Sequence, residues 1–139
     1  MRVALSFLFI GLMAFAWPAA ARAADPAQVA KVCAEADERY AELFGDQPAE
    51  DGVLVIKMYK YTFCPIDPEV KVGTTLRWVN VDKRTSHSVW FKEQGKPESE
   101  RLFSEEAIEM VMDEVGTFNY VCGPHEEQED MRATVTVIP

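Results

Sequence analysis

Apolar and polar residues alternate with a period of two over most of the chain after residue 52. Such alternation is typical of β-strands that bury one face, and the apolar positions are rich in β-branched and aromatic side chains. The pattern predicts strands over residues 53–63, 69–73, 75–79, 87–91, 116–122 and 133–138. Residues 101–112 fit either a helical turn or a strand. Many short strands separated by turn residues indicate an all-β, antiparallel sandwich.

An amphipathic helix is expected ahead of the strands, over residues 25–45. Its apolar residues recur at helical spacing, Pro26 suits a first turn, and Gly45 ends the pattern. A polar linker follows. We therefore expect one domain, residues 53–139, preceded by an added N-terminal helix and linker in residues 24–52.

The first residues have the pattern of a secretory signal peptide. A basic start at Arg2 precedes an apolar run over residues 5–17, and residues 21–23 (Ala-Arg-Ala) fit the small-x-small cleavage rule. The alternative is a membrane anchor, but the run is shorter than the roughly 20 residues that a spanning helix needs. We therefore predict that residues 1–23 are a signal peptide, that the protein is periplasmic, and that it does not insert into the membrane after cleavage.

The net charge of the chain limits the kinds of molecule that it is expected to bind. The chain has 14 Lys and Arg residues against 23 Asp and Glu residues, a formal net charge of −9. Loss of Arg2 and Arg22 with the signal peptide leaves a net charge of −11. A surface of this charge repels nucleic acid and anionic lipid, and it suits a basic protein partner or simple solubility. We expect a monomer that does not bind nucleic acid.

Both histidines of the chain belong to a pattern of metal-binding side chains. His87 begins a predicted strand after a polar turn. His125 lies three residues after Cys122, and Met131 follows six residues later, so one loop between two strands carries a thiolate, an imidazole and a thioether. Two imidazoles and a thiolate in a plane, with a weak axial thioether, form the type 1 (blue) copper site that transfers single electrons.

Strand parity turns both ends of this loop toward the interior. Cys122 shares a strand face with Phe118 and Tyr120, and Met131 shares one with Ala133. If the apolar members of these faces form the core, both outer ligands of the loop point inward. We therefore predict one copper ion, cycling between Cu(I) and Cu(II), with four ligands: His87, Cys122, His125 and Met131.

These segments resemble the plastocyanin, pseudoazurin and amicyanin group of cupredoxins. The resemblance rests on the ligand loop from residue 116 to 137, on His87-Ser-Val89, and on the flanking strands from residue 53 onward. It implies a Greek-key β-sandwich, one copper ion, and single-electron transfer between larger redox partners. It also implies that electrons pass through the exposed edge of the loop histidine, His125.

The ligand loop departs from these relatives in two ways. The spacing from His125 to Met131 is longer, and the residues between them are mostly acidic instead of apolar or small. An amide can replace the axial thioether in related sites, so Gln128 is an alternative to Met131, and so is a glutamate carboxylate. Zinc bound by three cysteines and His125 is a further alternative, but it leaves His87 and Met131 unexplained.

Three cysteines in an exported protein suggest one disulfide and one working thiolate. Cys33 lies in the predicted helix and Cys64 follows the first predicted strand, and neither belongs to a metal motif. An oxidising compartment favours a bond between them, which would attach the helix to the sandwich. Two free thiols are the alternative.

Three functions fit such a site. The four ligands leave no open position for substrate, and no general base or nucleophile accompanies them, so we expect an electron carrier and not an enzyme. Its partner would be a basic c-type cytochrome or an oxidoreductase. The alternatives are a periplasmic copper-trafficking protein and a non-blue copper site with a carboxylate ligand. The acidic loop residues are either a docking surface around His125 or only a solvated face: Glu126, Glu127, Glu129 and Asp130.

Overall fold

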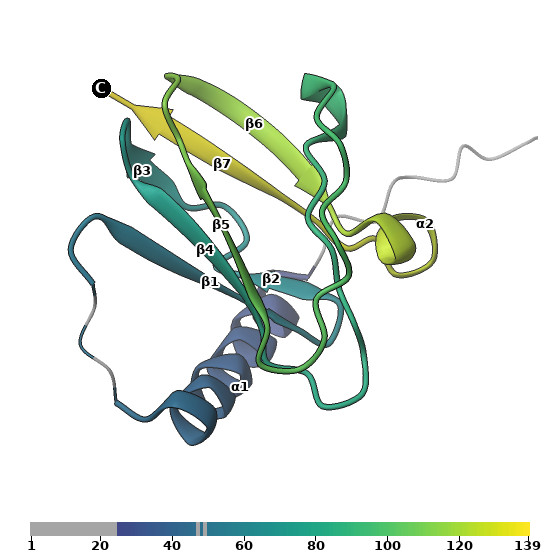
Figure 1. Ribbon diagram of the computed structural model, residues 1–139. Coiled ribbons are helices and arrows are strands. Elements are labelled where there is room, and N and C mark those ends of the chain that lie inside the picture. The colour runs from purple at the N-terminus through teal and green to yellow at the C-terminus, as the bar shows by residue number, and fades with distance from the viewer. Residues whose placement is uncertain (1–24, 47, 49) are drawn as a thin grey trace, which may run out of the picture.

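The computed structural model describes residues 25–46, 48 and 50–139 (Figure 1). The predicted signal peptide, residues 1–23, lies outside the described residues. Over the part of the chain that is described, no helix is both long enough and apolar enough to cross a membrane.

Within the described residues, seven strands form two sheets that pack face to face (Figure 1). The four-stranded sheet has the order β2-β1-β4-β5, and the three-stranded sheet has the order β3-β7-β6. The strands are β1 (Val53–Tyr59), β2 (Thr62–Cys64), β3 (Glu69–Lys71), β4 (Thr75–Asn80), β5 (Ala107–Val111), β6 (Gly116–Val121) and β7 (Arg132–Ile138). This architecture confirms the predicted Greek-key β-sandwich with an added N-terminal helix.

Two strand pairs run parallel, so the expectation of a wholly antiparallel sandwich is wrong. β1 pairs with β4 in parallel, with Val53 opposite Thr75, and β3 pairs with β7 in parallel. The pairs β1–β2, β4–β5 and β6–β7 are antiparallel. The parallel pairs therefore join strands that are distant in the sequence: β1 at the start of the domain pairs with β4, and β3 pairs with β7 at its end.

Three segments differ in detail from the predicted strands. Residues 53–63 form a hairpin instead of one strand, because the chain reverses at Lys60 and Tyr61 between β1 and β2. Residues 87–91 make two isolated bridges, at His87 and Trp90, and no regular strand. The open segment 101–112 contains strand β5. Three short helices complete the described part of the fold: η1 (Lys92–Gln94), η2 (Gly123–His125) and α2 (Glu126–Glu129).

The core lies between the two sheets and is centred on aromatic rings. Trp78 of β4 and Tyr120 of β6 are almost completely buried, and their ring centroids are 5.6 Å apart. Phe63 and Phe91 pack against Tyr120 at 4.8 and 5.1 Å. Burial raises the pKa of the Tyr120 hydroxyl far above its ordinary value. This packing closes the end of the core next to Cys122, which is itself fully buried.

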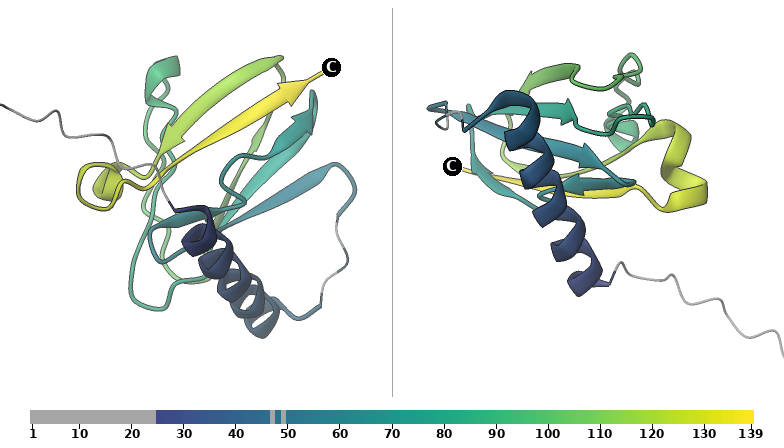
Figure 2. Two further views of the ribbon diagram at one scale, coloured as in Figure 1. Left: turned by 180° about the vertical axis from the view of Figure 1, so that it is seen from behind. Right: turned by 90° about the horizontal axis from the view of Figure 1, so that it is seen from below.

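Helix α1 (Pro26–Phe44) covers the outer face of the four-stranded sheet (Figure 2). The Asp25 side chain caps its first turn by accepting from the amide of Ala27, as expected of an N-cap aspartate. Ala36 packs with Val79 and Val81 on the opposite side of the sheet from the main core. The helix predicted over residues 25–45 is therefore confirmed.

A disulfide joins Cys33 of α1 to Cys64 of β2. The two Cα atoms are 5.2 Å apart, within the range that bridged cysteines occupy. The predicted pairing is confirmed, and it leaves Cys122 as the free, buried thiol among the described residues.

Candidate metal centre

The loop between β6 and β7 carries three of the four predicted ligands. Cys122 follows β6, His125 ends η2, and Met131 precedes β7. Backbone hydrogen bonds hold this loop closed: the Cys122 amide donates to the Met131 carbonyl (3.0 Å), and the Met131 amide donates to the His125 carbonyl (3.1 Å). The His125 amide in turn donates to the Cys122 carbonyl at 3.0 Å. The positions of all three residues are therefore set by one braced segment of backbone.

His87 reaches the same place from a distant part of the chain. It forms a two-way backbone bridge with Leu102, with N–O distances of 3.0 and 2.8 Å. The nearby bridge between Trp90 and Val121 brings this segment against the end of β6, directly before Cys122. His87 and Cys122 are both fully buried.

Three donor atoms converge at the end of the sandwich. Sγ of Cys122 lies 3.3 Å from Nδ1 of His125 and 3.8 Å from Nδ1 of His87. The ligand atoms of the three residues all lie within 4.8 Å of one another. Metal–nitrogen and metal–sulfur bonds of roughly 2.0–2.3 Å place donors of a trigonal site about 3.5–3.8 Å apart. The spacing and the soft, mixed nitrogen and sulfur donor set fit a copper ion.

Met131 lies in the interior at the same end of the fold. It is 1% exposed and shares the inward face of β7 with Ala133 and Val135. Gln128, the alternative axial ligand, is exposed on α2, as are the neighbouring Glu127 and Glu129. The burial pattern predicted from strand parity is thus confirmed for Cys122 and Met131.

The outer nitrogen of His87 has a partner that the sequence analysis missed. Nε2 of His87 is 2.8 Å from Oδ2 of Asp82, which fixes the ring so that Nδ1 faces Cys122. Burial opposes the charged form of this imidazole, but the hydrogen bonds and charges of Asp82 and Cys122 outweigh burial and raise the pKa of His87. The sequence feature that could have indicated this partner is the position of Asp82, five residues before the candidate ligand His87.

Ser88 links the two ligand segments and was also missed. Its amide points at Sγ of Cys122 (3.4 Å), and its hydroxyl oxygen accepts from the Gly123 amide (3.0 Å). The same hydroxyl donates to Oε1 of Glu98 at 2.6 Å. A Cβ atom on Gly123 would lie 2.2 Å from that carboxylate oxygen, so glycine there lets Glu98 close over the link.

His125 is the partly exposed member of the cluster. Burial lowers its pKa, and the charges of His87 and Arg101 lower it further. The carboxylates of Glu129 and Asp82 act in the opposite direction. Charges of both signs therefore surround this imidazole, whereas the sequence suggested acidic residues alone.

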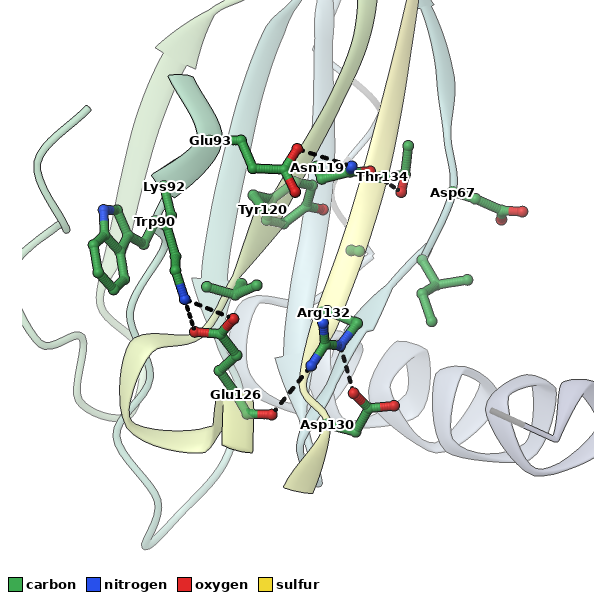
Figure 3. A pocket seen from close by; sticks show the side chains of 13 residues that line it. Asp67, Trp90, Lys92, Glu93, Asn119, Tyr120, Glu126, Asp130, Arg132 and Thr134 are labelled. Atoms are coloured by element: carbon green, nitrogen blue, oxygen red, sulfur yellow. Dashed lines mark hydrogen bonds and ion pairs between the residues drawn. The ribbon is translucent and has the colours of Figure 1, made fainter. Parts of the chain in front are cut away.

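Two acidic residues of the ligand loop make ion pairs at a neighbouring cleft. Glu126 pairs with Lys92 at 2.8 Å, and Asp130 pairs with Arg132 (Figure 3). These four residues line a cleft of about 640 Å³, and Trp90 and Tyr120 are among its other lining residues (Figure 3). Glu127 and Glu129 are the remaining exposed acids of α2.

Comparison with known families agrees with this centre. The sequence profile of "copper binding proteins, plastocyanin/azurin family" matches residues 51–138. The chain belongs to this family. It is therefore a copper protein of the electron-transfer kind, as the resemblance to cupredoxins implied. The match begins after α1, so the helix precedes the segment shared with the plastocyanin/azurin family.

Solved structures of amicyanin are similar to the chain. An oxidised methionine-to-leucine mutant of amicyanin is 28% identical with a TM-score of 0.57, and the match covers 65% of this chain and 86% of that one. A reduced tryptophan-to-tyrosine mutant is 29% identical, with the same TM-score and coverage. A reduced Cu(I) form of a proline-to-glycine mutant at pH 4 is 30% identical with a TM-score of 0.56 and the same coverage. A comparison with curated protein sequences gives no match.

Proposed function

We propose that the protein is exported to the periplasm and carries single electrons on one copper ion bound by His87, Cys122, His125 and Met131. The observation that carries the proposal is the convergence of one cysteine sulfur and two imidazole nitrogens at the end of the sandwich, with Cys122 and His87 buried and His125 partly exposed. A copper ion at that point supplies one-electron exchange between Cu(II) and Cu(I). The chain's own contribution is to hold the donors in a fixed arrangement.

Rigidity of the donor set suits electron transfer better than catalysis. Backbone hydrogen bonds brace the ligand loop, and Asp82 and Ser88 support His87 and Cys122 from behind. Donors that do not move between oxidation states keep the reorganisation energy small. With Met131 as a fourth ligand, no position stays open for substrate, which supports a carrier without enzymatic activity.

Met131 is the axial ligand in this proposal. Its backbone is hydrogen-bonded to Cys122 and His125, and its side chain is buried in the same core cluster as Cys122. Gln128 lies on the exposed helix α2. Within the described residues, the cluster of convergent donors contains no carboxylate, so a non-blue site with a glutamate ligand has no support in the geometry.

The visible spectrum of the copper-loaded mature protein tests this function. A Cu(II)–thiolate bond to Cys122 predicts strong charge-transfer absorption, and Cys122→Ser should abolish it because a hydroxyl is a hard, poor donor in this site. If the colour survives, Cys122 is not the ligand. Transfer of Cu(I) to an acceptor protein within one redox cycle, in place of repeated oxidation and reduction, would instead identify the copper-trafficking alternative.

A further inference from the structure

The turn between β1 and β2 places an aromatic side chain against both histidines of the metal centre. The ring centroid of Tyr61 lies 4.9 Å from that of His125 and 6.3 Å from that of His87. Both contacts are edge to face, with interplanar angles of 70° and 80°. Tyr61 is 39% exposed while His87 is fully buried, so the tyrosine ring forms the surface over the imidazoles. Edge-to-face pairs at such distances are attractive.

The backbone of this turn is unusual for the residues that form it. Lys60 and Tyr61 have φ angles of 46° and 58°, and hairpin turns with two positive φ angles are formed mostly by Asn, Asp and Gly. A left-handed conformation is unfavourable for a residue with a Cβ atom. Such residues persist where the surrounding structure fixes them, often at functional sites. Tyr61 thus occupies a position that glycine would fill with less strain.

Contacts from outside the hairpin fix the turn in place. The Lys60 amide donates to Oδ2 of Asp82 at 3.0 Å, and this is the same oxygen that contacts Nε2 of His87. The Lys60 ammonium pairs with Glu35 of α1. The Cys33–Cys64 bond joins α1 to the last residue of β2. The added helix therefore supports the hairpin both at its turn and at the end of its second strand.

We propose that Tyr61 is a positioning residue that caps the two histidines and restrains the imidazole of His125. The inference rests on the proposed function for the role of these histidines as ligands. His125 is partly exposed and sits on a short helical turn, whereas His87 and Cys122 are buried, so His125 has the most room to move among these three residues. A ring packed against it opposes that movement, and the strained turn exists to place this ring.

Variants of Tyr61 separate the effect of the ring from the effect of the backbone. Tyr61→Gly removes the ring and relieves the positive φ angle, so the hairpin itself is not weakened. Tyr61→Phe keeps the ring at the same position. Transfer of Cu(I) to an excess of a chelator such as bathocuproine disulfonate should become about 2- to 12-fold faster in Tyr61→Gly, which is the factor that one aromatic pair contributes. Tyr61→Phe should match the parent protein.

The metal-free protein provides an independent measurement. Proton NMR of the parent and of Tyr61→Phe should show ring-current shifts on the ring protons of His125 and His87, and Tyr61→Gly should lose the part due to residue 61, leaving the shifts that the two imidazoles, 5.2 Å apart, cause in each other. The proposal fails if Tyr61→Gly releases Cu(I) at the parent rate, or if Tyr61→Phe releases it as fast as Tyr61→Gly. Failure of the proposed function would look different, because the parent protein would then show no thiolate charge-transfer band while the metal-free spectra still report the contact.

Discussion

Single atoms behind the ligands do much of the positioning. One oxygen of Asp82 serves both the Lys60 amide and His87, and the hydroxyl of Ser88 joins the Gly123 amide to Glu98. The candidate ligands could be named from the sequence because Cys122 and the two histidines are rare residues in a metal-binding pattern, and the structure brings the three together. Aspartate and serine near a polar turn are common, so their roles emerge only when the distances are known.

Glu98 brings a negative charge close to the Cys122 thiolate by way of Ser88. Loss of this charge disfavours Cu(II) relative to Cu(I), so Glu98→Gln should raise the reduction potential by roughly tens of millivolts, the scale of one screened charge several ångströms away. Glu100→Gln removes the same charge from an exposed side chain two residues later and is the matched control. Voltammetry measures both variants, and equal shifts would show that Glu98 acts only through net charge.

Replacement of Met131 tests the axial ligand. Met131→Leu should keep copper bound and coloured and should raise the reduction potential, because a weak donor that favours Cu(II) is lost. Gln128→Leu, on the exposed helix α2, should leave the potential unchanged. The reverse pattern, with a shift only in Gln128→Leu, would assign the axial position to the glutamine.

At the scale of elements, the sequence predicts most of the extended segments, but it does not predict which strands pair with one another. Alternation is the same in parallel and antiparallel strands, so the parallel pairing of β1 with β4 left no trace in the pattern. The chain reverses at Lys60 and Tyr61 without an Asn-Gly signal, and residues 53–63 therefore resembled one strand. Residues 87–91 lack a continuous ladder because their backbone bridges run to two different segments, from His87 to Leu102 and from Trp90 to Val121.

The disulfide is expected to stabilise the fold without affecting the copper spectrum. Closing a loop of 31 residues restricts the unfolded chain by about 3–4 kcal/mol in the chain-entropy estimate. The double variant Cys33→Ser/Cys64→Ser should lose roughly that free energy of unfolding in urea titrations and keep the charge-transfer band.

Thiol counting on the denatured, metal-free, unreduced parent should find one free thiol, and a count of three would contradict the bond.

Charge is distributed unevenly over the whole molecule. Ion pairs with Lys92 and Arg132 occupy Glu126 and Asp130, so Glu127 and Glu129 carry the negative charge of α2 toward solvent. Arg101 acts on His125 from another segment. Of the four acids that the sequence offered as a docking surface or a solvated face, two thus remain without these ion pairs, next to a cation, within a mature chain whose expected net charge is −11.

Electron transfer to a basic partner should depend on salt. Steering by opposite charges raises association rates by roughly 10- to 1,000-fold and weakens as ionic strength rises. Glu127→Gln/Glu129→Gln should lower the stopped-flow rate with a basic c-type cytochrome at low salt and flatten its salt dependence. Asp113→Asn/Glu114→Gln removes the same charge beside the other end of β6 and should change the rate less. A rate that ignores salt and both pairs of changes would leave the acids as a solvated face.

The backbone hydrogen bonds that close the ligand loop also determine whether the chain folds before or after it binds copper. They run between Cys122, His125 and Met131 themselves, so the ordering entropy of the site is lost when the chain folds. Copper uptake then requires no folding step, and the metal stabilises the fold by an amount that rises with the logarithm of its free concentration relative to its Kd. The chain can therefore fold completely before it binds copper. Loading of the folded protein then depends on the concentration of available copper.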